Sequence, residues 1–193
     1  MQQKSARIFE SAKHLFDEIG YEAVTTQQIA DRADVAAGTL FRYAASKAEL
    51  LLMVYNQVLR SSIEEGNAAA HGAATPTGKI LALIEPTLHA GDQRSENTIA
   101  YQRELLFGTA VERYRREGIE LVMRLERLIA QILTRGEPND ASMKAARSVF
   151  GVVHLALAQP STGVWAETDR AAGIKTQVAQ IVAGYYAVAS PDN

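Results

Sequence analysis

Hydroxyl, amide and cationic side chains gather near the start of the chain, between residues 25 and 47. They occur in three groups, Thr25-Thr26-Gln27-Gln28, Ala36-Ala37-Gly38-Thr39 and Arg42-Tyr43 with Lys47. Side chains of these types and helix N-termini bind phosphates, and small residues let a helix come close to base edges. This chemistry needs two short helices joined by a tight turn, with the second helix facing outward. That geometry is a helix-turn-helix, whose second helix enters a DNA groove.

The segments around these residues are predicted to be helices. In the first segment apolar residues recur at helical spacing, at Ile8, Ala12, Leu15 and Ile19. Gly20 follows, where a left-handed C-cap residue is expected. Thr25 or Thr26 is expected to cap the next helix, and Gln28 can close a capping box with Thr25. Leu40, in the third helix, is expected to point back to the core.

Helical periodicity continues to the end of the chain, without a strand pattern or an internal repeat. A capping box from Ser46 to Glu49 opens a long helix that we expect to end near Gly66. Thr75-Pro76 marks the start of the next helix, which Pro86 should bend or break before it ends at Gly91-Asp92. Further helices are expected over about residues 96–107 and 111–133, after the turn at 136–140, and near the C-terminus.

These elements predict an all-α fold with two parts. An N-terminal three-helix helix-turn-helix DNA-binding domain would occupy residues 1–50. A C-terminal helical ligand-binding and dimerisation domain would occupy residues 51–193.

Composition excludes several classes of protein and site. The net charge of −2 excludes a uniformly basic surface, so contact with nucleic acid must come from a local patch. With no cysteine, the chain has no disulfide, zinc finger or thiol nucleophile. The histidines, His14, His71, His89 and His154, lack metal-ligand spacing. We therefore expect no metal and no cofactor. Since no apolar run is long enough to cross a bilayer and no signal peptide is evident, we expect a cytoplasmic protein without a membrane partner.

Residues 8–55 resemble the N-terminal domain of the TetR (tetracycline repressor-like) family of bacterial regulators. The motifs that carry this resemblance occur in order, as Gly20-Tyr21, Thr25-Thr26, Ile29-Ala30, Gly38-Thr39-Leu40-Phe41 and Ser46-Lys47. In the C-terminal part the resemblance extends only to the helical layout. The resemblance implies a regulator that binds double-stranded operator DNA as a homodimer.

The resemblance also implies roles for single residues. Thr26 and Lys47 would contact phosphates, and Gln27 would face the operator from the front of the second helix. From the third helix and its end, the DNA-facing residues would be Ala37, Gly38, Thr39, Phe41 and Tyr43. The residues themselves add that Arg42 is able to reach phosphate. Because bidentate side chains carry most base discrimination, Gln27, Gln28 and Arg42 are the candidates for direct readout, and DNA shape would contribute the rest.

Three departures from the family pattern bear on stability and DNA contact. Phe41 replaces a phosphate-binding tyrosine and lacks its hydroxyl. Asp34 and Ala36 replace a turn glycine and a serine, so the recognition helix loses a side-chain cap worth about 1 kcal/mol. Ala44 replaces a core aromatic residue, and we expect Phe41 to turn inward and fill that space.

The C-terminal part is expected to supply a dimer interface and an effector pocket. The last two helices carry more apolar surface than one small core can cover, and Gly151, Ala146 and Ala156 would allow close helix approach. Two such helices from each subunit would form the homodimer. The candidate effector-binding residues are Tyr101, Glu104, Phe107, Tyr114, Met123, His154 and Trp165.

The function predicted from these observations is a DNA-binding transcriptional repressor that a small-molecule effector releases from a palindromic operator. It is not an enzyme, because the sequence shows no nucleophile–base pair, carboxylate cluster or phosphate-binding glycine loop. Two alternatives stay open from the residues alone. One is an all-helical small-molecule-binding protein or enzyme without DNA-binding activity. The other is a helical partner-binding protein with a vestigial head, which Ala36, Phe41 and Ala44 would suit.

Overall fold

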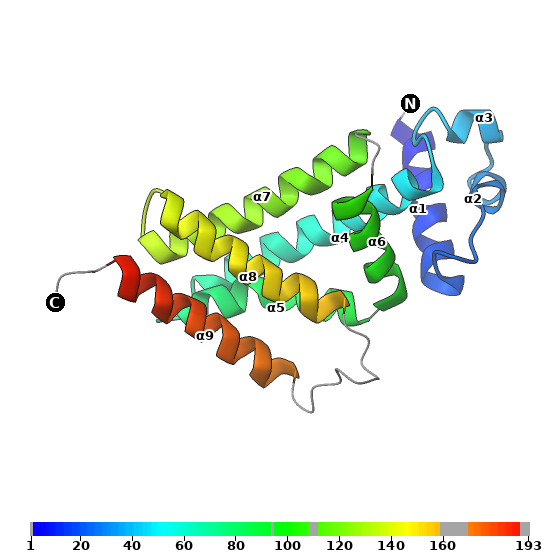
Figure 1. Ribbon diagram of the computed structural model, residues 1–193. Coiled ribbons are helices and arrows are strands. Elements are labelled where there is room, and N and C mark those ends of the chain that lie inside the picture. The colour runs from blue at the N-terminus through cyan, green and yellow to red at the C-terminus, as the bar shows by residue number, and fades with distance from the viewer. Residues whose placement is uncertain (1, 94, 109–111, 159–169, 190–193) are drawn as a thin grey trace. The chain divides into compact units, whose positions relative to one another are not determined.

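The described part of the chain is entirely helical. The computed structural model describes residues 2–93, 95–108, 112–158 and 170–189, and these form nine α-helices and no strand (Figure 1). In chain order they are α1 (Gln2–Ile19), α2 (Thr26–Arg32), α3 (Ala37–Leu40), α4 (Lys47–Ala70), α5 (Pro76–Asp92), α6 (Ser95–Phe107), α7 (Arg113–Thr134), α8 (Asp140–Ala158) and α9 (Arg170–Ala189). The predicted all-α class is confirmed.

The chain folds into two compact units. Unit 1 contains residues 1–59 and 94–121, and unit 2 contains residues 60–93 and 122–193. Unit 1 therefore holds α1, α2, α3, the first half of α4, α6 and the start of α7. Helix α6 belongs with the head by its packing, although it lies far from the head in sequence. The functional division at residue 50 remains a prediction.

Unit 1 has its core where the sequence pattern places it. Ile8 and Phe16 of α1, Ile29 of α2 and Leu40 of α3 are fully buried. Gly20 ends α1 with a φ of +80°, and its N–H donates to the carbonyl of Phe16, as the predicted C-cap requires. The predicted direction of Leu40, back to the core, is confirmed.

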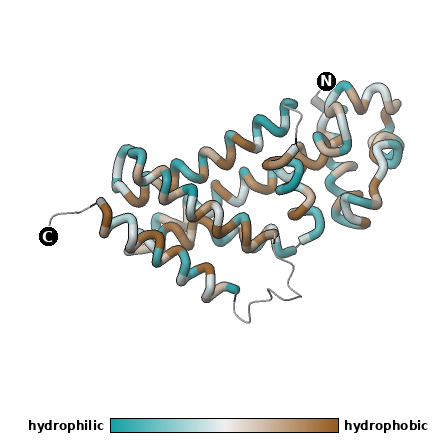
Figure 2. Tube along the Cα trace, in the orientation of Figure 1, coloured by the Kyte–Doolittle hydropathy of each residue, from teal (hydrophilic) through white to brown (hydrophobic). Residues whose placement is uncertain are grey.

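Unit 2 is a helical bundle in which α5, α8 and α9 pack on one another, with α8 and α9 side by side (Figure 1). Helix α7 shows its two faces in Figure 2, where hydrophobic and hydrophilic residues alternate within each turn. Its Leu125, Ile129 and Leu133 are buried, whereas Arg124 and Arg127 are exposed. An amphipathic helix of this kind gains its stability from the buried stripe.

Two predicted helix boundaries are wrong, each for a packing reason. Helix α4 does not end at Gly66 but continues to Ala70. A Cβ atom at Gly66 would lie 2.0 Å from the carbonyl oxygen of Leu83, so this glycine lets α4 approach the backbone of α5. Helix α5 starts at the predicted Thr75 cap but is not broken at Pro86. Buried Leu83 and Ile84 hold this helix against the core on the residues preceding the proline.

Candidate nucleic-acid interface

The first turn of α2 is fixed by a reciprocal capping box. The Thr25 side chain accepts from the N–H of Gln28 at 3.2 Å, and the Gln28 side-chain oxygen accepts from the N–H of Thr25 at 2.8 Å. The predicted box is confirmed. It engages the Gln28 oxygen at the cap, while the Gln27 amide donates to Asp31 at 2.7 Å. Both glutamines proposed for base readout therefore make contacts within α2 in the free protein.

The turn between α2 and α3 is a left-handed bend at Asp34, whose φ is +52°. The sequence places an aspartate where the resembling family has glycine, and the backbone does adopt the conformation that glycine prefers. Arg7 contacts this residue twice, donating to its carboxylate and to its carbonyl, each at 3.3 Å. The N-cap residue of α3, Ala36, makes no side-chain cap bond, as predicted. Recognition helix α3 is thus held by the turn and its core contact rather than by a cap.

The outward face of α3 is slim. Gly38 is exposed, and a Cβ atom added there would meet no other atom within 4 Å. Ala37 and Thr39 on either side are half-buried. Neither the backbone conformation nor the packing of this chain requires glycine at position 38, so its small size leaves room for something outside the chain.

The expectation that Phe41 turns inward is wrong. Phe41 is 45% exposed, while Ala44 is buried without its help. The backbone explains this, because Phe41 follows Leu40 directly and Leu40 already occupies the inward direction of this short helix. Phe41 therefore adds apolar surface beside the front of α3. Arg42, next to it, is exposed, and Tyr43 is half-buried.

Lys47 is engaged within unit 1. Its ammonium group donates to the carbonyls of Tyr21 at 2.8 Å, Glu22 at 3.2 Å and Val24 at 2.9 Å. It also lies 4.4 Å from the centre of the Tyr21 ring. An ammonium group has three donors, so Lys47 fastens the start of α4 to the loop between α1 and α2. A phosphate contact from Lys47 remains a prediction, and it would require the ammonium group to exchange at least one of these bonds.

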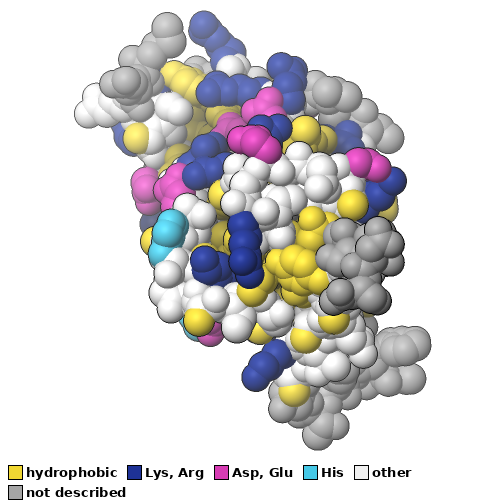
Figure 3. Space-filling view, turned by 90° about the vertical axis from the view of Figure 1, so that its left-hand side faces the viewer, with side chains coloured by type: hydrophobic (Ala, Val, Ile, Leu, Met, Phe, Trp, Pro, Cys, Tyr) yellow, Lys and Arg dark blue, Asp and Glu magenta, His cyan; other side chains and the backbone are white. Residues whose placement is uncertain are grey.

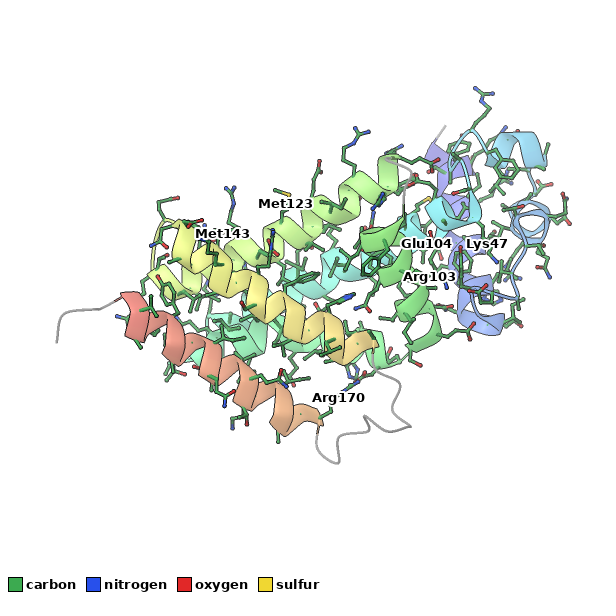
Figure 4. The ribbon with its side chains drawn as sticks, in the orientation of Figure 1. Lys47, Arg103, Glu104, Met123, Met143 and Arg170 are labelled. Carbon is green, nitrogen blue, oxygen red and sulfur yellow. The ribbon has the colours of Figure 1, made fainter. Side chains whose placement is uncertain are left out.

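Helix α6 joins the head through Asn97, a residue that the sequence analysis did not single out. Asn97 is buried, and its amide donates to the carbonyl of Phe16 at 2.7 Å while its oxygen accepts from the N–H of Tyr21 at 2.7 Å. Both backbone groups lie where α1 ends. Arg103 of α6 adds an exposed ion pair to Glu22 at 3.2 Å, and its place on α6 is labelled in Figure 4 together with Lys47.

The start of α7 is capped by a distant carboxylate. Ser46 accepts from the N–H of Glu49 at 3.1 Å, which is half of the predicted capping box. The Glu49 carboxylate does not complete the box, and accepts instead from the N–H groups of Tyr114 and Arg115, both at 3.1 Å. Burial raises the pKa of Glu49, and these two bonds oppose the rise. A local pattern could predict the serine cap but not a partner 65 residues away.

A buried hydrogen-bond chain joins α6, α4 and α7 inside unit 1. The Tyr101 hydroxyl donates to the Asn56 oxygen at 2.9 Å, and the Asn56 amide donates to the carbonyl of Tyr114 at 2.7 Å. Desolvation is the main cause that raises the pKa of Tyr101. Gly118 lies against this chain, since a Cβ atom there would be 2.6 Å from the Asn56 oxygen. The predicted effector residues Tyr101 and Tyr114 therefore have structural partners already.

The other predicted effector residues are spread over the molecule. Phe107 is 73% exposed and Met123 is 56% exposed. Glu104 is half-buried and pairs with Arg103 at 3.5 Å. His154 stacks on Phe150, and burial lowers its pKa. Trp165 lies outside the described residues.

None of the predicted effector residues lines either of the grooves that unit 1 and unit 2 show in the described part of the chain. Within that part, no three His, Asp or Glu side chains are placed to hold a metal ion. No helix there is long and apolar enough to cross a membrane.

Comparison with known proteins agrees with the geometry of the head. The sequence profile of "Bacterial regulatory proteins, tetR family" matches residues 8–54, the segment that holds α1, α2, α3 and the first turns of α4. The chain belongs to the TetR family. It is thus a DNA-binding transcriptional regulator with an operator as its partner, and not an enzyme.

Relatives of this chain extend the match beyond the head. The transcriptional repressor KstR of Mycobacterium tuberculosis is 27% identical over 150 residues, which cover 78% of this chain and 67% of KstR. The solved structure of FadR from Thermus thermophilus, a TetR-family repressor in complex with lauroyl-CoA, has a TM-score of 0.70 at 22% identity and covers 94% of this chain and 93% of FadR. A TetR regulator from Rhodococcus sp. RHA1 has a TM-score of 0.77 at 16% identity, with 94% and 96% covered. The TetR fold therefore spans both units.

Proposed function

We propose that this TetR regulator is a cytoplasmic repressor that a small molecule releases from a palindromic operator. The observation that carries the proposal is the front of α3, where Gly38 is exposed and meets no atom of its own chain. Glycine in a helix costs about 1 kcal/mol relative to alanine, and nothing in the fold requires that cost here. Close approach to DNA gives a reason for it. KstR, which is similar over most of the chain, is itself a repressor.

In this proposal residues 1–50 are the reading domain. Residues 51–193 bind the effector and a second copy of the chain. The front of α2 and α3 faces the operator and Arg42 reaches a phosphate. The DNA-facing set is Thr26, Gln27, Gln28, Ala37, Gly38, Thr39, Phe41, Arg42, Tyr43 and Lys47. Because Gln27 and Gln28 already hold partners in α2, base readout through them would need those bonds to be exchanged, which favours shape readout.

The decisive test separates DNA binding from stability at one position. Gly38→Ala should leave the fold intact and raise the free energy of unfolding by about 0.4–1 kcal/mol, because alanine narrows the unfolded ensemble. The same change should weaken binding to a duplex selected from a random pool, since the methyl group enters the contact surface. Gly136→Ala is the matched control, because Gly136 is also exposed with open space around its Cβ position. Equal DNA affinity for Gly38→Ala and wild type would remove the carrying observation.

A salt titration tests the phosphate contacts. Arg42 is exposed, and its guanidinium holds no partner within the described part of the chain, so Arg42→Ala should not disturb the fold. Each lost phosphate contact lowers the slope of log affinity against log salt by about 0.9 in a single site. Lys144→Ala, on α8, serves as a control with the same change of charge. Unchanged slopes for Arg42→Ala would place Arg42 off the DNA.

The proposed homodimer uses α8 and α9. Leu155 of α8 is 56% exposed and Val188 of α9 is 77% exposed. Gly151 is exposed with open space at its Cβ position, whereas Ala146 and Ala156 are buried inside the protomer. One head contacts too little DNA, and two heads related by two-fold symmetry would reach half-sites about 34 Å apart or a multiple of that. Light scattering should show a dimer that Leu155→Glu weakens, and a monomeric wild type would contradict the proposal.

The effector must bind the form that does not bind DNA, and DNA must then weaken effector binding by the same factor. The FadR structure of Thermus thermophilus contains lauroyl-CoA, which makes fatty acyl-CoA esters the first compounds to test. Addition of lauroyl-CoA should release the selected duplex in a fluorescence anisotropy assay, with CoA alone as the control. If acyl-CoA esters of several chain lengths leave the complex intact, this class of effector is wrong.

A further inference from the structure

A groove in unit 2 lies where α4 ends, α5 begins and α7 ends. Its volume is about 620 Å³, within the range of small-molecule sites. The groove contains none of the residues assigned above to DNA binding, to the dimer or to the effector. Its chemistry is therefore unaccounted for.

The charge in this groove has one sign. Lys79 of α5 and Arg135, just after α7, both line it, and no Asp or Glu is among its described lining residues. The whole chain has 22 acidic and 20 basic residues, so a lining with cations alone differs from the rest of the molecule. Within the described part of the chain, neither Lys79 nor Arg135 has an ion pair or a side-chain hydrogen bond. Both cations are thus available to a ligand.

The backbone at Arg135 gives a second and independent indication. Arg135 has a φ of +56°, in the left-handed region that glycine or asparagine normally occupies after a helix. An arginine there costs stability that glycine would not, and strained positions of this kind cluster at ligand sites. The next residue is Gly136, so a glycine is present one position too late to relieve the strain.

The rest of the lining suits a ligand with an aliphatic part. Ala70 is buried, and Leu128 and Ile132 are half-buried on the α7 side of the groove. The His71 Nδ1 atom lies 2.8 Å from the carbonyl of Asn67, which orients the ring and leaves Nε2 as the ring nitrogen that faces other partners. The end of the molecule drawn in Figure 3, where α7 ends and α8 begins, shows Lys and Arg side chains next to exposed hydrophobic ones.

We propose that this groove binds an organic anion, a carboxylate or a phosphate carried on a short aliphatic arm. Lys79 and Arg135 hold the anion, and Leu128 and Ile132 contact the arm. The proposal goes beyond the repressor function and does not depend on DNA binding. It also differs from the effector site predicted from the sequence, with which it shares no residue.

The test is an NMR titration of the full-length, ¹⁵N-labelled protein with four probes. Octanoate and octyl phosphate carry the two kinds of anion, octanol carries the arm alone, and inorganic phosphate carries the charge alone. One of the two anionic amphiphiles, or both, should shift the amide signals of the lining residues, and the pair distinguishes a carboxylate from a phosphate ligand. Octanol and inorganic phosphate should each bind at least about tenfold more weakly, because each lacks one of the two contacts.

Three variants decide whether the named cations hold the anion. Lys79→Gln should weaken the affinity about tenfold, as expected for the loss of one charge-assisted contact. Arg135→Gly should weaken it similarly while making the protein more stable, because glycine fits the left-handed backbone, so this loss cannot come from misfolding. Lys144→Gln removes one charge from α8 of the same unit and should leave the affinity unchanged.

The proposal is overturned if octanol binds as well as the anionic probes, if the shifts map to other residues, or if no anionic probe binds. It is also overturned if Lys144→Gln weakens binding as much as Lys79→Gln, since the effect would then be that of net charge. These outcomes are independent of DNA binding, so they are separate from any failure of the repressor assays.

Discussion

Asn97 is the side chain whose loss should damage the head most clearly. It joins α6 to the end of α1 by two hydrogen bonds of 2.7 Å, both to buried backbone groups. Asn97→Leu keeps the approximate volume and removes both bonds. The N–H of Tyr21 would then lose its side-chain partner, a cost of about 1–3 kcal/mol for a buried donor. The carbonyl of Phe16 would retain the bond from Gly20 at 3.1 Å, so its loss should cost less.

The expected total for Asn97→Leu is about 2–4 kcal/mol in the free energy of unfolding. For a chain of this size that corresponds to a fall in melting temperature of about 4–16 °C. Urea unfolding followed by circular dichroism measures the free energy directly. Protein concentration must be equal for variant and wild type, because self-association would make the midpoint depend on it.

Asn97→Asp tests the same geometry through pH. The carboxylate still accepts from the N–H of Tyr21, but its second oxygen faces the carbonyl of Phe16. Burial and this carbonyl raise the pKa of the new carboxyl group in the folded state, so its contribution to stability is lost as pH rises. As pH falls, the protonated group can donate to Phe16 and the variant should approach wild type. The reasoning is refuted if Asn97→Leu costs less than about 0.5 kcal/mol, the size of an ordinary surface change, or if the deficit of Asn97→Asp is the same at pH 4 and pH 8.

Three further predictions concern single contacts. Because burial raises the folded-state pKa of Glu49, its contribution to stability is full below the ordinary glutamate pKa and is lost as pH rises through the raised value. Glu49→Gln should therefore lose less stability than wild type between pH 4 and pH 8, and parallel pH profiles would contradict this. Gly66→Ala should cost about 3 kcal/mol or more by overpacking against Leu83, and a variant as stable as wild type would show that the helices separate freely. Arg147→Met should cost about 1–3 kcal/mol in urea unfolding, since Glu126 is buried and bonded by that guanidinium at 3.0 and 2.9 Å; Lys144→Met is the control that should change little.

The features that the sequence predicted are those set by neighbours along the chain. The Thr25–Gln28 box, the Gly20 cap and the inward Leu40 each depend on residues within a few positions, and all are confirmed. The order of motifs in the head likewise led to the family that the comparisons support. Local spacing is sufficient for such features because a helix places its side chains by periodicity alone.

The features that the sequence did not predict depend on residues far apart in the chain. Gly66 was taken for a helix end, because glycine is a common terminator, but its reason is the Leu83 carbonyl on another helix. Glu49 fitted a local capping box, yet its carboxylate was taken by α7. Such a choice between a local and a distant partner depends on tertiary packing, which one sequence does not reveal.

The same distinction bears on where the head ends. By sequence the head closes near residue 50, but Asn97 and Arg103 bring α6 into unit 1, and Glu49 brings in the start of α7. These contacts are made to backbone groups at the ends of α1 and α7 or across an exposed ion pair, and none of them lies on the surface of α2 or α3. A change in α6 or α7 would therefore act on the frame that holds α1 and α4, without altering the residues that face DNA. That arrangement leaves the DNA-facing surface free to vary with the operator while the polar ties of unit 1 keep it in position.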